Sequence, residues 1–239
     1  MDNSGYIGLS RQAGLLKELN SVANNIANAD TNGYRREGAV FAEHVKSLGT
    51  SDPSISIPTM SHRYVDLSAG KVMTTDNPLD LAIDGEGFFL IETPNGERLS
   101  RDGAFSVNAE NELVNANGMR VLDNGGGSIT IPPDATSITV TGNGAVYANN
   151  QAIGEIGIAT ADPAFLIREG GNLFRAENGY EPATDATIQQ NALEKSNVSA
   201  IVEMARLIEV QRTYEAGQRL IQNEDDRIKR TLRALGQQQ

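Results

Sequence analysis

The sequence predicts a mixed α and β fold, in which helices at the N- and C-terminal ends pair as a coiled-coil-like core domain, with a central, mainly antiparallel all-β domain between them in the chain. Apolar residues recur every seven places at both ends, as in helices that pack on a partner. The middle alternates short β-forming runs with Asn-Gly and Asp-Gly dipeptides, which is typical of hairpins. Charge separates the same regions: of the net charge of −11 over 239 residues, residues 47–189 carry −12 and the two ends together +1.

The N-terminal helix is expected over about residues 7–28. Its apolar residues follow a seven-residue spacing with companions three places later, which gives the a and d stripe of a helix that pairs. They are Leu9, Leu16, Leu19, Ala23 and Ile26. Gln12 interrupts the d line. The asparagines that follow favour turns over helix, and Gly33 offers a conformation in which the chain can stop and turn.

The C-terminal helix repeats the pattern over a greater length. Its seven-residue steps are Ala200, Leu207, Tyr214, Ile221, Ile228 and Leu235. A start near Asn197 or Ser199 is expected, because both residue types cap helices well. Between residues 198 and 210 further apolar residues, Ile201 among them, surround the helix, whereas one line alone stays apolar after Arg212. Since one narrow seam is too little for a stable isolated helix, this helix is expected to require partners.

The middle of the chain is expected to form antiparallel strands joined by tight turns. The expected strands are residues 79–83, 88–91, 104–107, 112–114, 128–131, 137–140 and 155–160. Residues 47–73, with two prolines among small polar residues, indicate an irregular segment. The predicted domains are a discontinuous helical core of residues 1–34 and 192–239, an irregular connector of residues 35–75 and a β domain of residues 76–191.

No catalytic, cofactor-binding or metal-binding residue is assigned from the sequence. The chain has no cysteine and only two histidines, His44 and His62, without the spacing of metal ligands. Carboxylates are abundant, but solvated turns and sheet edges account for them. The segment Gly85-Glu86-Gly87 lacks the third glycine and the following helix of a dinucleotide loop, and predicts a turn into a buried strand. We therefore expect no enzyme, no cofactor and no small-molecule substrate.

The charge and hydropathy patterns limit the partners and the location. An acidic middle disfavours nucleic acid, because phosphate binding needs a basic patch. No stretch approaches the length and apolarity of a membrane span, and the N-terminus has no basic region followed by an apolar run. A cleaved signal peptide is therefore not expected, and any passage out of the cytoplasm needs another route.

Four ordered groups of residues resemble the bacterial flagellar rod and hook proteins. They are residues 23–36, residues 79–89, residues 100–105 with 113–118, and a C-terminal series of 193–198, 203–204 and 211–215. The positions that match the family signature are Asn24, Asn25, Asn28, Gly33, Gly85, Gly87, Phe88, Phe89, Asn197, Arg212 and Tyr214. Tyr34 and Glu86 depart mildly from the family, in which Phe and Asp are commoner.

The resemblance implies a structural subunit of the hollow rod of the flagellar basal body. Family members are exported unfolded through the flagellar type III apparatus and assemble in the periplasm with copies of themselves and with other rod proteins. Their terminal helices line the core of the rod, which transmits torque, and their β domain faces outward. The short connector fits a proximal-rod member best. The alternatives are a distal-rod member and, in another class, a cell-wall-acting enzyme.

The apolar residues named above for the two helices, together with Ile201, are the expected assembly interface. We hypothesise that both helices stay poorly ordered in the free subunit, because their seams lack partners, and fold as neighbouring subunits bury them.

Overall fold

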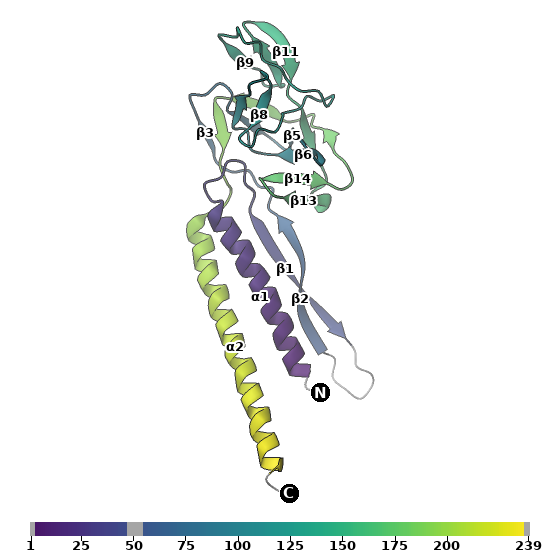
Figure 1. Ribbon diagram of the computed structural model, residues 1–239, viewed down its shortest axis with the longest axis vertical. Coiled ribbons are helices and arrows are strands. Elements are labelled where there is room, and N and C mark those ends of the chain that lie inside the picture. The colour runs from purple at the N-terminus through teal and green to yellow at the C-terminus, as the bar shows by residue number, and fades with distance from the viewer. Residues whose placement is uncertain (1–2, 47–54, 237–239) are drawn as a thin grey trace. The chain divides into compact units, whose positions relative to one another are not determined.

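The computed structural model describes residues 3–46 and 55–236, and within these ranges the side chains of residues 8–39, 64–231 and 233. The described residues divide into two compact units. Unit 1 takes its residues from 1–27, 37–66 and 199–239, and unit 2 from 28–36 and 67–198 (Figure 1). Each unit therefore combines segments that lie far apart in the sequence.

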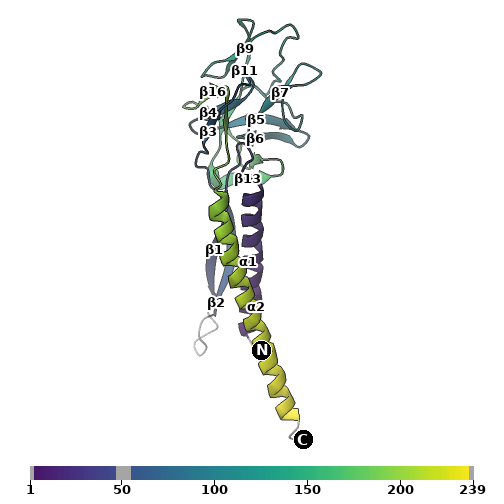
Figure 2. The same cartoon turned by 90° about the vertical axis from the view of Figure 1, so that its left-hand side faces the viewer.

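Unit 1 consists of two helices and a hairpin. The helices are α1 (Asn3–Ala27) and α2 (Ala200–Gly236), and the hairpin strands are β1 (Glu37–Lys46) and β2 (Ile55–Val65). Helix α1 contacts both α2 and the hairpin, as Figure 1 and Figure 2 show from two directions. The helices run antiparallel, because Asn25 at the end of α1 contacts Glu203 at the start of α2.

The two terminal helices predicted from the seven-residue spacing are confirmed. Helix α2 begins at Ala200, where the expected cap residue Ser199 accepts a hydrogen bond at its carbonyl from the Glu203 N–H, at 3.0 Å. Helix α1 ends at Ala27, one residue before the expected end. The chain then passes through turns, and Gly33, six residues after the end of the helix, adopts a positive φ of 64°.

The expectation of an irregular connector over residues 35–75 is wrong. Most of its described residues are extended: β1 and β2 pair antiparallel along their lengths, and β3 (Val72–Thr74) pairs with β17 (Ala192–Glu194). Proline indicated a break, yet Pro58 lies within β2, opposite Glu43. In a two-stranded ribbon both strands are edges, so the N–H that proline lacks need not have a partner strand.

Unit 2 is built from short strands that pair antiparallel throughout its described part, which confirms the predicted β region. Besides β3 and β17 its strands are β4 (Leu81–Asp84), β5 (Phe88–Thr93), β6 (Gly96–Ser100), β7 (Phe105–Val107), β8 (Leu113–Asn115), β9 (Ile138–Val140), β10 (Ala145–Ala148), β11 (Gln151–Glu155), β12 (Ile158–Thr160), β13 (Leu166–Glu169), β14 (Leu173–Ala176), β15 (Glu181–Pro182) and β16 (Thr187–Gln190). A 3₁₀ turn, η1 (Pro163–Phe165), precedes β13.

The largest sheet of the described residues has the strand order β13-β14-β6-β5-β12-β15. The sequence predicted β5 and β12 but missed β6, β13 and β14, which are rich in charged residues. The strand expected at residues 128–131 is wrong in extent, because these residues make isolated bridges at Ser128 and Thr130. The predicted Asn95-Gly96 turn is confirmed: it joins β5 to β6, and Gly96 has a φ of 98°.

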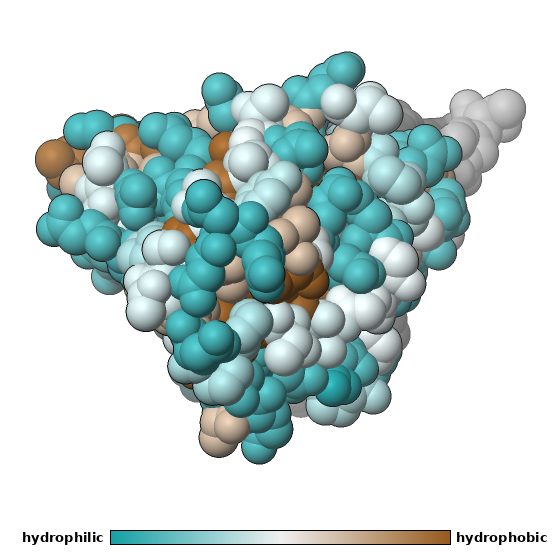
Figure 3. Space-filling view, turned by 90° about the horizontal axis from the view of Figure 1, so that it is seen from above, coloured by the Kyte–Doolittle hydropathy of each residue, from teal (hydrophilic) through white to brown (hydrophobic). Residues whose placement is uncertain are grey.

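The core of unit 2 lies between these strands. Phe89 is fully buried and meets Phe105 edge to face, with ring centroids 5.0 Å apart. Around this pair pack Leu81, Ile83, Ile91, Leu113, Val121, Ile129, Ile131, Val140, Val146, Ile156, Ile158, Leu173 and Ile188. The face of unit 2 that carries β9 and β11 is covered mostly by hydrophilic residues (Figure 3).

Truncating Phe89 to Ala is expected to destabilise unit 2 by about 3–5 kcal/mol, because it removes a ring from the centre of the core and leaves a cavity. Urea unfolding followed by tyrosine fluorescence measures the change. The matched control is Val107→Ala, since Val107 is exposed and should shift the free energy of unfolding by less than about 0.5 kcal/mol. Equal effects of the two substitutions would contradict the position of Phe89 in the core.

Candidate assembly interface

The side of α1 that faces α2 is largely polar. Gln12 donates from Nε2 to the carbonyl oxygen of Tyr214 at 3.0 Å. Arg206 donates from Nη2 to Oε1 of Glu18 at 2.5 Å. Beside these contacts, Leu15 and Val22 are buried. The helix pair is therefore joined by hydrogen bonds and an ion pair as well as by apolar contact.

Asn25 joins three elements of unit 1. Its Nδ2 donates to Oε2 of Glu203 on α2 at 3.1 Å and to the backbone carbonyl of Glu37 on β1 at 2.8 Å. Its Oδ1 accepts from the Glu37 N–H at 2.9 Å. Asn25 is 0% exposed and Glu203 is 1% exposed. The neighbouring signature residue Asn24 is exposed, so one of two adjacent asparagines makes the buried contacts.

The residues of α1 expected at the assembly interface lie at or near the surface of unit 1. Leu9 is 60% exposed, Leu16 and Ala23 are also exposed, and Leu19 and Ile26 are half-buried. The strongest apolar line of α1 is thus not the line that its own chain buries.

The expected residues of α2 divide between two faces. Ala200, Leu207, Tyr214 and Ile221 are half-buried, whereas Ile201 is 80% exposed and Ile228 is exposed. The helix of Leu235 is described, but its side chain lies outside the described residues. At 3.6 residues per turn, Ile201, Met204 and Ile208 share the side of α2 opposite the buried Glu203 and Val210. These three apolar side chains form an uncovered stripe.

The signature motifs of unit 2 meet around the buried carboxylate of Glu194, at the end of β17. Oε1 of Glu194 accepts from Arg35 Nη1 at 2.5 Å and from the Gly70 N–H at 2.7 Å, and Oε2 accepts from Arg101 Nε at 2.7 Å. All three charged side chains are almost completely buried. Segments from both ends and from the middle of the chain are thereby bound to one carboxylate.

Arg101 and Gly33 fix the backbone around this carboxylate. Arg101 also donates to three backbone carbonyl oxygens, those of Ile83, Gly85 and Gly87. The Gly33 N–H donates to the Glu194 carbonyl at 2.7 Å, and a Cβ on Gly33 would lie 2.3 Å from the backbone of Arg101. No other residue fits at position 33, which explains this glycine of the signature.

Two other signature residues, Phe88 and Asn197, make contacts in the same unit. Phe88 packs against Phe174, with centroids 5.5 Å apart. Asn197 accepts from the Arg36 N–H at 2.7 Å and donates to the Ser68 carbonyl at 3.0 Å. The remaining signature positions are Asn28, which accepts from the Thr31 hydroxyl, and Arg212, which is exposed on α2.

The electrostatics of the cluster follow from burial and pairing. Burial opposes ionisation of Glu194, but hydrogen bonds and charges from Arg35 and Arg101 hold its pKa below the ordinary value of 4.5. Burial lowers the pKa of Arg101 from its ordinary value, against the attraction of Glu194. Glu194 is therefore a carboxylate at neutral pH, with both guanidinium groups as counter-charges.

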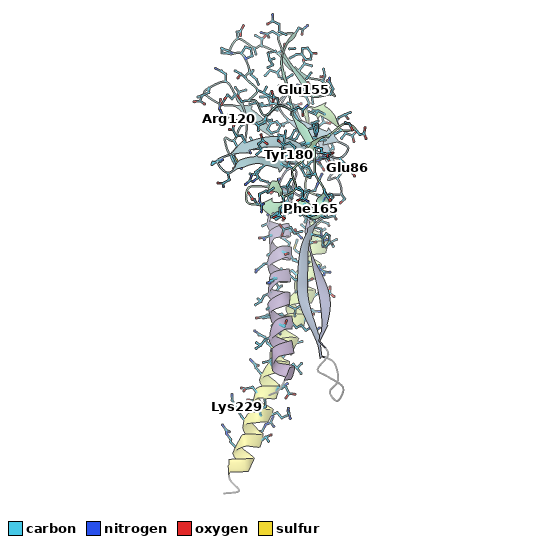
Figure 4. All side chains as sticks on the ribbon, turned by 90° about the vertical axis from the view of Figure 1, so that its right-hand side faces the viewer. Glu86, Arg120, Glu155, Phe165, Tyr180 and Lys229 are labelled. Carbon is cyan, nitrogen blue, oxygen red and sulfur yellow. The ribbon has the colours of Figure 1, made fainter. Side chains whose placement is uncertain are left out.

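A pocket of about 920 Å³ adjoins this cluster within unit 2. Its lining includes Arg35, Arg101, Phe88, Glu86 and Tyr180, of which Glu86 and Tyr180 are labelled in Figure 4. The Tyr180 hydroxyl donates to Glu97, and burial together with this bond raises the pKa of Tyr180 to about 12. Both arginines of the pocket lining, Arg35 and Arg101, donate to Glu194, and Arg101 also donates to backbone carbonyl oxygens.

Sequence reasoning assigned no role to Arg35, Arg101, Glu194 or Glu203, although each lies in a matching motif. Charged residues are usually exposed, and their burial depends on partners that a single sequence does not reveal. Among the described residues, no group of three or more His, Asp or Glu side chains is placed to hold a metal ion. Within the same residues, no helix has the length and apolarity that crossing a membrane requires.

Replacing Glu194 with Gln is expected to destabilise unit 2 by about 3–5 kcal/mol at neutral pH, because two buried guanidinium groups lose their counter-charge. Since the folded-state pKa of Glu194 is depressed, its contribution is fully present above the unfolded value near 4.5 and is lost as the pH falls through the folded value. Urea unfolding at several pH values should therefore give a steeper acid loss for the natural chain than for Glu194→Gln.

The control for this substitution is Glu177→Gln, which removes an exposed ion pair with Arg175 and should change stability by less than about 1 kcal/mol. Parallel acid curves for the natural chain and Glu194→Gln would contradict the ion cluster.

Three known families match successive parts of the chain. Residues 6–35 match "Flagella basal body rod protein", residues 82–148 match "Flagellar hook protein FlgE/F/G D1 domain", and residues 189–234 match "Flagellar basal body rod FlgEFG protein C-terminal". The matched ranges include Asn25, Arg35, Arg101, Glu194 and Glu203, whose side chains make buried polar contacts in the two units.

Curated relatives match nearly the whole chain. The flagellar basal-body rod protein FlgF of Caulobacter vibrioides is 40% identical, and that of Mesorhizobium japonicum is 35% identical, each with 99% of both chains covered. FlgG of Caulobacter vibrioides is 33% identical, with 88% of this chain and 90% of the relative covered. The chain therefore belongs to the flagellar basal-body rod protein family, and within it is most like FlgF.

Proposed function

We propose that this chain is a structural subunit of the flagellar basal-body rod and enters it through the outward apolar residues of α1 and α2. The observation that carries the proposal is the exposure of Ile201, Met204 and Ile208 on the side of α2 away from α1. Exposed apolar side chains in one stripe at helical spacing mark a surface that a partner covers.

The two exposed stripes support an open-ended assembly. The stripe of α1, with Leu9 and Leu16, differs in residues and spacing from that of α2. Two different surfaces on one subunit favour head-to-tail contacts, which repeat along a helix when they do not close into a ring. In this proposal, α1 and α2 of neighbouring subunits pack in a coiled-coil-like manner and form the core of the rod, with the β domain outward.

The place in the flagellum is proposed from the relatives. Similarity to FlgF over 99% of both chains favours the proximal rod, and the distal rod, to which the FlgG relatives point, is the alternative. We further propose export through the flagellar type III apparatus, assembly in the periplasm with copies of itself and other rod proteins, and transmission of torque.

A structural role without catalysis is part of the proposal. The most deeply buried carboxylate of unit 2, Glu194, is engaged by two guanidinium groups and a backbone N–H, which leaves it unsuited to proton transfer. The related proteins are named as rod proteins. A cell-wall-acting enzyme would instead need two carboxylates that converge on a substrate.

Replacing both Ile201 and Ile208 with Asp is expected to lower incorporation into rods by at least about tenfold, because two charges would be buried in the proposed contact. Complementation of a deletion strain, with swimming assays and immunoblots of purified basal bodies, measures the effect. The control Asn223→Asp adds a charge at an exposed polar position of the same helix, 15 residues beyond Ile208, and should leave incorporation unchanged. Normal rods from the doubly substituted chain would rule out this surface.

A further inference from the structure

The apolar residues of the helix pair do not by themselves determine its register. On α2, Leu207, Tyr214 and Ile221 recur every seven residues, and on α1 the line Gly8, Leu15 and Val22 also has a seven-residue spacing. If α1 slid along α2 by seven residues, each residue of the α1 line would again lie opposite an apolar residue of the α2 line. Periodic seams of this kind distinguish registers poorly unless a buried polar residue is present.

The contact between Asn25 and Glu203 breaks this periodicity. A slip of seven residues in one direction would place Val210 opposite Asn25, and leave a buried amide against an apolar side chain. A slip in the other direction would place Glu203 opposite Glu18, and bring two carboxylates together. Both arrangements are unfavourable, because buried polar groups without partners and buried like charges raise the free energy of the slipped state.

Further contacts agree with the same register. Asn25 both donates to and accepts from the backbone of Glu37, so these two hydrogen bonds also hold α1 against β1 at this point. Near the other end of α1 the helices approach closely: a Cβ at Gly217 would lie 2.1 Å from Nε2 of Gln12 and would displace this amide from the Tyr214 carbonyl oxygen. This close approach recurs at neither Val210 nor Glu224, the residues one repeat away.

We infer that Asn25 and Glu203 are positioning residues that select the register of the antiparallel helix pair. The register sets which residues of α1 lie level with Ile201, Met204 and Ile208, and so fixes the composite surface offered to a neighbour. That consequence for assembly rests on the proposed function, whereas the choice of register is a property of the single chain and is tested on it alone.

The absence of cysteine from the natural sequence makes the register directly measurable. A Cβ built on Gly8 lies 3.1 Å from Cγ1 of Ile221, so Gly8→Cys with Ile221→Cys places two thiols within disulfide reach in the native register. Gly8→Cys with Tyr214→Cys, and Gly8→Cys with Ile228→Cys, report slips of seven residues in the two directions. Equilibration of each full-length protein with a glutathione buffer gives an effective thiol concentration for each pair in the monomer.

The native pair should have an effective concentration about tenfold or more above both slipped pairs in the natural background. When Asn25→Leu and Glu203→Leu are introduced together, this ratio should fall toward one for at least one slipped pair. Replacing both partners avoids an orphaned polar group, and circular dichroism checks that the helices remain. The conservative change Glu203→Gln keeps an acceptor for Asn25 and should retain the native preference.

The matched control is Asn24→Leu with Glu209→Leu, which makes the same two chemical changes at exposed positions of the same helices. It should leave the tenfold preference intact. An unchanged preference in the Asn25→Leu, Glu203→Leu protein would overturn the inference and assign the register to the rest of the chain. Equal effective concentrations for all three pairs in the natural background would overturn it as well. Neither result depends on whether Ile201 and Ile208 contact a neighbouring subunit.

Discussion

The carboxylate of Glu194 is the contact on which the arrangement of unit 2 depends. It binds Arg35, from the segment that follows α1, and Arg101, from the loop between β6 and β7, and it caps the Gly70 N–H. Because a buried ion is favourable only when its partners are in place, the first and last segments of unit 2 stabilise each other. Arg101 then carries the same constraint to the backbone of residues 83–87. This cluster explains Gly33 of the signature, and it includes the backbone carbonyl oxygens of Gly85 and Gly87.

The helix pair of unit 1 buries several polar residues and leaves several apolar residues exposed. Gln12, Glu18 and Asn25 of α1 are buried, whereas Leu9 and Leu16 are exposed. Among the described residues, Gln12 Oε1 and Ser21 Oγ are buried without a hydrogen-bond partner, which further weakens the pair within one chain. Polar contacts contribute to the pairing, and in the proposed assembly neighbouring subunits would bury the outward apolar residues.

The features that depend on local sequence pattern were predicted correctly. The helices, their ends and the antiparallel β region follow from spacing, caps and turn dipeptides. The hairpin of β1 and β2 was missed because Pro58 lies in a ribbon whose strands are both edges. Glu194 was missed because its partner Arg35 is 159 residues away. The hydropathy pattern also predicted Leu9 and Leu16 as interface residues, and not the neighbouring line of Gly8, Leu15 and Val22. The reason is that the face of α1 toward its own chain is the more polar one.

Hydrogen–deuterium exchange on the dilute free subunit and on assembled rods tests most directly whether the helix pair depends on neighbours. Backbone amides of α1 and α2 should exchange faster than those of β5 in the free subunit and become strongly protected in the rod, because assembly covers their apolar stripes. Amides of β4 and β5 should be protected in both states, since Leu81 and Phe89 are buried within one chain. Protection of α1 and α2 in the free subunit equal to that of β5 would contradict the account.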